Sequence, residues 1–186
     1  MSLAVALADA NVLIPRTLRD YIVYAAEAGA LQLHWSQSIL DEMSRNLIAK
    51  FGFTPDDAAE LELRLTEYLP KALIEVRRRD TQVVAKVEMD AKDRHVVAAA
   101  LSAKATILVT DNPRHFPTDW LAERKIGLLT PAELLRRLAA DQADALRTAH
   151  RLTVANSPKS QDAILATLKS QIGDVAADAV RRAVIE

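Results

Sequence analysis

Two short apolar segments that each lead into an acidic residue limit the folds open to this chain more than any other feature. Leu3–Ala8 contains no polar residue and stops at Asp9, and residues 105–110 (ATILVT) lead directly into Asp111. Apolar runs of this kind are typical of strands buried on both faces of a parallel sheet. Segments with helical spacing of apolar residues lie between them. The alternation predicts an α/β sandwich with a mainly parallel central sheet.

Capping and stop signals predict where the other elements lie. Ser36 or Ser38 is an expected N-cap, Thr54-Pro55 an expected helix start and Gly52 an expected C-terminal stop. The expected helices run from about Pro15 to a stop at Gly29, from the cap at Ser36 or Ser38 to the stop at Gly52, from Thr54 onward and over residues 92–103. The further expected strands cover residues 31–35, 72–76 and 128–129.

The segment after residue 131 loses its strand signals. Three helical stretches are expected there, at about 131–152, 158–172 and 174–184, separated by Asn156-Ser157-Pro158 and by Gly173. They have no sheet of their own to cover, so they need to pack on the preceding domain or on a partner. We therefore expect an α/β domain over residues 1–131 and a helical C-terminal segment over residues 132–186.

Composition excludes several classes of protein. The 186 residues include 24 Lys and Arg against 25 Asp and Glu, for a net charge of −1, and no Cys. Without Cys there is no disulfide framework, thiolate zinc site or cysteine nucleophile, which fits a reducing compartment. Residues 1–10 lack a basic leader, and no apolar run approaches the ~18 residues that span a bilayer, so a soluble cytoplasmic protein is expected. Any nucleic acid must be held locally, because the chain has no global basic field.

Four acidic residues from distant segments are placed to converge. Asp9 and Asp111 each follow a predicted strand, and the carboxyl edge of an open α/β sheet is where sites form. Glu42 lies in the helix after the second strand, and Asp93 begins the helix before residues 105–110. Several ionised carboxylates in one pocket repel one another and usually imply a bound cation. Oxygen ligands suit Mg²⁺ or Mn²⁺, which orient and deprotonate water in phosphodiester hydrolysis.

Four motifs occur in the order and at the spacing typical of PIN-domain nucleases. They are DANVL from Asp9, ILDEM around Glu42, DRHVVAAAL from Asp93 and ILVTDNPRHFP around Asp111. Together they resemble the PIN-domain family from residue 3 to about residue 131. The resemblance is strongest for VapC-type toxins of bacterial toxin–antitoxin pairs that carry an extra helical C-terminal segment.

The resemblance implies a PIN-like three-layer sandwich and a Mg²⁺- or Mn²⁺-dependent endoribonuclease, the toxin of a type II toxin–antitoxin pair. By position, Asp9, Glu42 and Asp93 match the acidic residues of the PIN site, and Asp111 is taken as the fourth catalytic and metal-binding residue. The resemblance also implies an RNA substrate, a small antitoxin that blocks or covers the site, and a homodimer.

Several alternatives stay open at this stage. Many PIN domains place the fourth acid where this chain has Asn112, so Asn112 is expected to assist Asp111. The shifted acid keeps a rival function open, a non-catalytic interaction module with the same fold. A phosphatase or a flap-type DNA nuclease could use the same carboxylates. Asp90 is an alternative to Asp93, and Asn11 is a further candidate in the first motif.

Basic and aromatic residues near the motifs are weaker candidates. Arg16 and Arg114 flank the acidic motifs in sequence and are candidate ligands for RNA phosphates. The triplet Arg77–Arg79 is more typical of a solvated loop than of an RNA-binding patch. Trp35 and Trp120 are expected in the core or in an interface rather than as base-stacking platforms.

Overall fold

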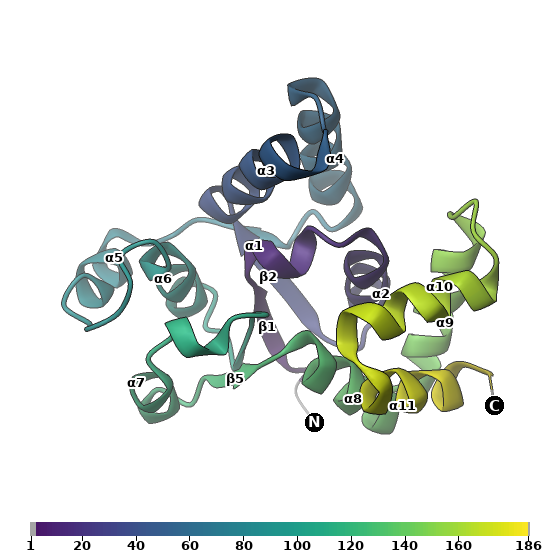
Figure 1. Cartoon of the computed structure of the whole chain (residues 1–186). Coiled ribbons are helices and arrows are strands. Elements are labelled where there is room, and N and C mark those ends of the chain that lie inside the picture. Colours follow the sequence, from purple (N-terminus) through teal and green to yellow (C-terminus); the bar gives the residue numbers. More distant parts are fainter. Residues whose placement is uncertain (1–2, 186) are drawn as a thin grey trace.

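A five-stranded, all-parallel sheet lies at the centre of the protein, as the computed structural model shows for residues 3–185 (Figure 1). The strand order is β3-β2-β1-β4-β5. The strands are β1 (Val5–Ala8), β2 (Gln32–Ser36), β3 (Leu73–Ile74), β4 (Ile107–Val109) and β5 (Gly127–Leu129). The predicted α/β fold with a parallel sheet is therefore confirmed, including the short edge strand at Leu128–Leu129.

The central pair of strands comes from the two apolar runs in the sequence. β1 and β4 lie side by side in parallel, with Ala8 opposite Val109. Leu7 and Leu108 are fully buried, because helices cover both faces of the sheet at this point. The chain adds β2 on one side of β1 and later returns to add β4 on the other side. This reversal of strand order is where open α/β sheets form their binding crevice.

Helices flank the sheet on both sides and cover its carboxyl edge. Figure 1 shows α2 and the C-terminal helices on one side, α5, α6 and α7 on the other, and α3 and α4 above the edge where β1 ends. The helices before residue 131 are α1 (Ala10–Leu13), α2 (Arg16–Glu27), α3 (Gln37–Phe51), α4 (Pro55–Tyr68), α5 (Arg78–Val84), α6 (Arg94–Ser102), the 3-10 turn η1 (Pro113–His115) and α7 (Thr118–Glu123).

Local capping chemistry fixes the ends of α3 and α4 as predicted. The Ser36 hydroxyl accepts a hydrogen bond from the Ile39 N–H at the start of α3. Gly52 ends α3 with a φ of 73°, in the left-handed region that glycine adopts without steric cost. Thr54 and Asp57 form a reciprocal capping box at the start of α4. The Ser36 cap sets where α3 begins, and thereby where Glu42 lies on it.

The structure corrects three of the sequence predictions and adds one helix. Arg78 and Arg79 of the basic triplet begin the helix α5 rather than lying in a loop, and the sequence patterns do not predict α7. Both helices are short, so they provide little of the helical periodicity that sequence reading relies on. β3 has only two residues, half-buried at the sheet edge, where a longer buried strand was expected. The expected helix 131–152 is broken at Gln142, whose backbone (φ −138°, ψ 42°) leaves the helical region without a Gly or Pro to signal it.

The C-terminal helices pack against α2 and against one another. They are α8 (Pro131–Asp141), α9 (Ala143–Ala155), α10 (Gln161–Ile172) and α11 (Asp174–Ile185). α9 makes the most extensive contact, along α2, where the Tyr21 hydroxyl lies 2.5 Å from His150 Nδ1 in a buried pair. Leu146 and Leu168 belong to the same continuous core as Leu7. No helix between residues 3 and 185 is long and apolar enough to cross a membrane.

Candidate functional site

Asp9 lies at the centre of the polar cluster where β1 and β4 end. It follows β1 directly and is the N-cap of α1, and only 4% of its surface is exposed. One carboxylate oxygen accepts from the Ala10 N–H at 2.7 Å. The other accepts from the Thr110 hydroxyl at 2.7 Å and from Asn11 Nδ2 at 2.9 Å. Three donors thus fix both oxygens of a buried carboxylate in one orientation.

Thr110 was not among the residues singled out from the sequence. It is fully buried and directly follows β4, so the pairing of β1 with β4 sets its hydroxyl against Asp9. Its Oγ1 also accepts from the Asn112 N–H at 3.1 Å. Thr110 therefore links the two strand ends. Thr110 directly follows β4 just as Asp9 directly follows β1, and this shared position after a strand is the signal in the sequence that could have identified Thr110.

Glu42 from α3 and Asp93 from the start of α6 contribute negative charge to the same cluster. Burial is the main cause that raises the pKa of Asp9, and the nearby carboxylates of Glu42 and Asp93 raise it further. The hydrogen bonds from Thr110 and Ala10 oppose this effect by favouring the ionised form. Three of the four predicted acids are thus brought together from three separate elements.

A histidine stands beside each of the two outer acids. His95 Nε2 lies 3.1 Å from Glu42 Oε2, within ion-pair distance but not aligned as a hydrogen bond, and its Nδ1 lies 2.7 Å from the Lys92 carbonyl oxygen. His115 Nδ1 lies 3.4 Å from Asp93 Oδ2. Burial raises the pKa of Asp93, and the adjacent His115 opposes that rise.

Asp93 and its sequence rival Asp90 have different surroundings. Asp93 occupies the N-cap position of α6, yet its side chain makes no capping hydrogen bond there, so it is free of the ordinary structural role of such a residue. Asp90 is exposed and accepts from the Lys92 N–H at 3.0 Å, as a turn-forming Asp does. The geometry favours Asp93 over Asp90 as the member of the cluster.

Asp111 and Asn112 are both exposed. The backbone N–H of Asp111 donates to Asn11 Oδ1 at 3.1 Å, so Asn11 bridges the loop after β4 to Asp9. The carboxylates that raise the pKa of Asp9 belong to Glu42 and Asp93 rather than to Asp111. The loop backbone is thus tied to the cluster, while the Asp111 side chain is more open to solvent than the other three acids.

The donor chemistry of the cluster fits a divalent cation. Its acids supply oxygen ligands of the kind that Mg²⁺ and Mn²⁺ prefer, and a cation would relieve the repulsion around the buried Asp9. Within residues 3–185, however, no three Asp, Glu or His side chains are arranged so that one ion could contact them all. Glu42 and Asp93 lie against His95 and His115 instead. Binding a cation between the acids would require these two side chains to turn away from their histidines.

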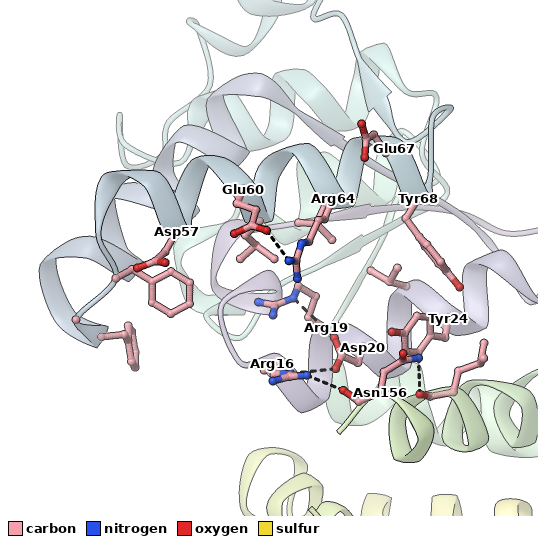
Figure 2. Close-up of a pocket in the computed structure, with 17 residues that line it drawn as sticks. Arg16, Arg19, Asp20, Tyr24, Asp57, Glu60, Arg64, Glu67, Tyr68 and Asn156 are labelled. Carbon is pink, nitrogen blue, oxygen red and sulfur yellow. Dashed lines mark hydrogen bonds and ion pairs between the residues drawn. The ribbon is translucent and has the colours of Figure 1, made fainter. Parts of the chain in front are cut away.

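Arg16 lies in a separate groove of about 1100 Å³ between α2, α4 and the end of α9. Figure 2 shows its guanidinium directed at Asp20 and at Asn156. It donates to the Asn156 carbonyl at 2.8 Å and lies 3.6 Å from Asp20. Its contacts therefore join α2 to the C-terminal segment. Arg114, the other predicted phosphate ligand, is exposed on η1 beside His115.

Comparisons with known proteins identify the family. The profile of the PIN domain matches residues 5–114, which carry every acid of the cluster. A curated relative, the putative ribonuclease VapC50 of Mycobacterium tuberculosis (strain ATCC 25618 / H37Rv), is 32% identical over 106 residues, 53% of this chain and 60% of that protein. The chain thus spans less than two thirds of that relative's length. No solved structure matches the chain. Since the PIN profile covers more than half of the sequence, the chain belongs to the PIN-domain family.

Proposed function

We propose that this PIN-domain protein is a divalent-metal-dependent endoribonuclease that acts as the toxin of a type II toxin–antitoxin pair. The observation that carries the proposal is the buried carboxylate of Asp9, held by three donors and surrounded by the charges of Glu42 and Asp93. Such a concentration of negative charge at a sheet switch point disfavours folding unless it serves a ligand. Family membership and the similarity to a putative ribonuclease support hydrolysis of RNA.

The residues of the cluster have distinct roles in this proposal. Asp9, Glu42 and Asp93 would hold Mg²⁺ or Mn²⁺, with Asp111 as the outer, more exposed acid. The bound ion would supply Lewis-acid activation of a water and neutralise charge on the scissile phosphate. Thr110 and Asn11 fix the orientation of Asp9, as outer-shell groups do at metal sites. Arg114, exposed on η1, is available to a phosphate of the substrate.

The proposal includes two protein partners. VapC50, the relative, is named as a putative ribonuclease of the VapC type, and a VapC-type toxin implies a small cognate antitoxin that covers the site. We further propose that the protein forms a homodimer. Co-purification of the chain with the product of a short neighbouring reading frame tests the first partnership, and sedimentation analysis of the isolated protein tests the second.

Replacement of Asp9 by Asn tests the proposed activity. Asp9→Asn should lower Mn²⁺-dependent cleavage of single-stranded RNA by more than about 100-fold, because loss of an outer-shell partner alone costs up to that much at metal sites. The fold should survive, since an amide of the same shape removes the buried charge, keeps the acceptor for Ala10 and can donate to Thr110 Oγ1, at the cost of the hydrogen bond from Asn11. Asp41→Asn is the matched control, because Asp41 is exposed on α3 beside Glu42 and bonds to Gln37.

Three results would contradict the proposal. Full metal-dependent cleavage by Asp9→Asn would show that the carboxylate cluster is not needed for catalysis. Failure of the purified wild-type protein to bind Mn²⁺ in calorimetry, together with absence of cleavage, would favour a non-catalytic interaction module. Equal loss in Asp9→Asn and Asp41→Asn would indicate a general effect of charge rather than a site.

A further inference from the structure

A second groove, of about 480 Å³, lies between α5 and α7, and none of its lining residues belongs to the carboxylate cluster. It combines three cationic side chains and an amide with an apolar and aromatic surface. Within the described part of the chain no carboxylate lines it, although the protein as a whole carries more acids than bases. Its lining residues are Arg79, Gln82, Val83, Lys86, Val87, Trp120 and Arg124.

Arg124 lies over the Trp120 ring in this groove. The Arg124 guanidinium carbon lies 3.5 Å from the centroid of the Trp120 ring, and Arg124 Nη1 donates to the Trp120 carbonyl at 3.0 Å. This contact holds the guanidinium over an aromatic face while leaving its positive charge near the groove. Bases of single-stranded RNA stack on aromatic rings and on guanidinium planes of this kind.

The cations are available to an anionic ligand. The Arg79 side chain is 71% exposed and lies 3.7 Å from the largely buried Asp80. Arg124 lies 3.6 Å from Glu123, whose own side chain is 73% exposed and does not line the groove. Lys86 is exposed on the turn that follows α5. Val83, at 44% exposure, adds apolar surface between the charges.

Both walls of the groove connect to residues of the proposed active site. α5 packs on α6, whose N-cap is Asp93, and α7 follows directly after η1, whose His115 contacts Asp93. Figure 1 shows α5, α6 and α7 together on one side of the sheet. The groove therefore lies on two helices that each lead to Asp93.

We infer that the groove between α5 and α7 binds a single-stranded segment of RNA adjacent to the cleavage position. This inference rests on the proposed ribonuclease function. Arg79, Lys86 and Arg124 neutralise phosphates, and the stack of Trp120 and Arg124 receives a base. Such a subsite explains how a chain with a net charge of −1 holds a polyanion without a global basic field.

The test measures RNA affinity separately from cleavage. The full-length Asp9→Asn protein in EDTA is titrated with a fluorescein-labelled, mixed-sequence single-stranded RNA of about 12 nucleotides, within the range of single-strand binding sites. Each phosphate contact contributes about −0.7 to the slope of log K against log salt. Adding Lys86→Ala and Arg124→Ala should flatten that slope by about 1.4 and weaken binding about 25-fold at about 0.1 M salt.

Matched controls separate this groove from bulk charge. Arg181→Ala with Arg182→Ala removes the same number of exposed cations from α11 and should leave the slope unchanged. Trp35 is fully buried and Trp120 is half-buried in the groove, so RNA should quench tryptophan fluorescence, and Trp120→Phe should abolish the quenching.

Unchanged affinity and slope in the groove variant would overturn the inference, as would an equal loss in the α11 control. If the groove variant changes self-association in sedimentation analysis but not RNA affinity, the groove is a protein interface and the inference is wrong. If the proposed ribonuclease function is wrong, the experiments give a different set of results. In that case the wild-type protein cleaves no RNA, whereas the groove variant still shows its loss of binding.

Discussion

Replacing Leu146 by Ala tests whether the C-terminal helices and the PIN domain unfold as one unit. Leu146 lies on α9, is fully buried, and belongs to the same hydrophobic core as the central strands. α9 packs along α2 of the PIN domain and also against α11. We propose that residues 1–131 and 132–186 are distinct in sequence but form a single cooperative structure.

The expected loss follows from the burial of the side chain. Leu→Ala substitutions at fully buried sites cost about 2.7–5.0 kcal/mol, depending on how far the cavity collapses. We expect about 3 kcal/mol for Leu146, because packed helices surround it and restrict relaxation. With a urea m-value of about 2 kcal/mol/M, the midpoint of unfolding should fall by about 1.5 M. The thermal midpoint should fall by about 6–12 °C for a chain of this size.

The positions of the tryptophans make the assay specific. Both tryptophans, Trp35 and Trp120, precede residue 131, so fluorescence reports only on the PIN domain. Far-UV circular dichroism reports on all helices, including α8 to α11. In one cooperative unit, Leu146→Ala shifts the urea midpoint equally by both probes. Leu63→Ala on α4, where the side chain is 57% exposed, is the matched control and should shift neither.

A two-step transition would refute this reasoning. The specific refuting result is a fluorescence midpoint that stays at the wild-type value while part of the dichroism signal is lost at lower urea. The C-terminal helices would then form an independent unit, and their contact with α2 would contribute little to stability.

Three further predictions follow from particular residues. Asp111→Asn should lose most cleavage activity and Asn112→Ala less, since only a carboxylate offsets the charge of a metal ion; the reverse order in kcat/KM would move the fourth ligand by one residue. Burial lowers the pKa of His150, so the folded state favours the neutral imidazole. The stability that this side chain contributes is therefore complete above the pKa of the unfolded state, about 6.5, and is lost as the pH falls toward the lower pKa of the folded state. Between about pH 7.5 and pH 5.5 the thermal midpoint of the wild type should therefore fall further than that of His150→Gln, and equal changes would show that His150 does not titrate in this range. Gly52→Ala should cost about 1 kcal/mol in urea unfolding because of the positive φ at the end of α3, and an unchanged midpoint would indicate that the backbone relaxes there.

Features that depend on local interactions can be predicted from the sequence. The apolar run before Asp9, the Ser36 cap and the Thr54–Asp57 capping box each act within a few residues, so the strand and helix starts were predictable. The order of the acidic motifs also lies in the sequence, and it led to the PIN family that the profile match bears out.

Which side chains meet in space depends on how distant segments of the chain pack together. The Thr110 hydroxyl reaches Asp9 across 101 positions of sequence because β4 pairs beside β1 in one register. Sequence position alone placed Asp111 with the other acids, whereas in the structure its side chain faces solvent. The groove lies between α5 and α7, and both helices are too short to show helical periodicity of apolar residues in the sequence. Local patterns cannot specify such contacts, because they depend on how distant segments pack rather than on the preferences of the segments themselves.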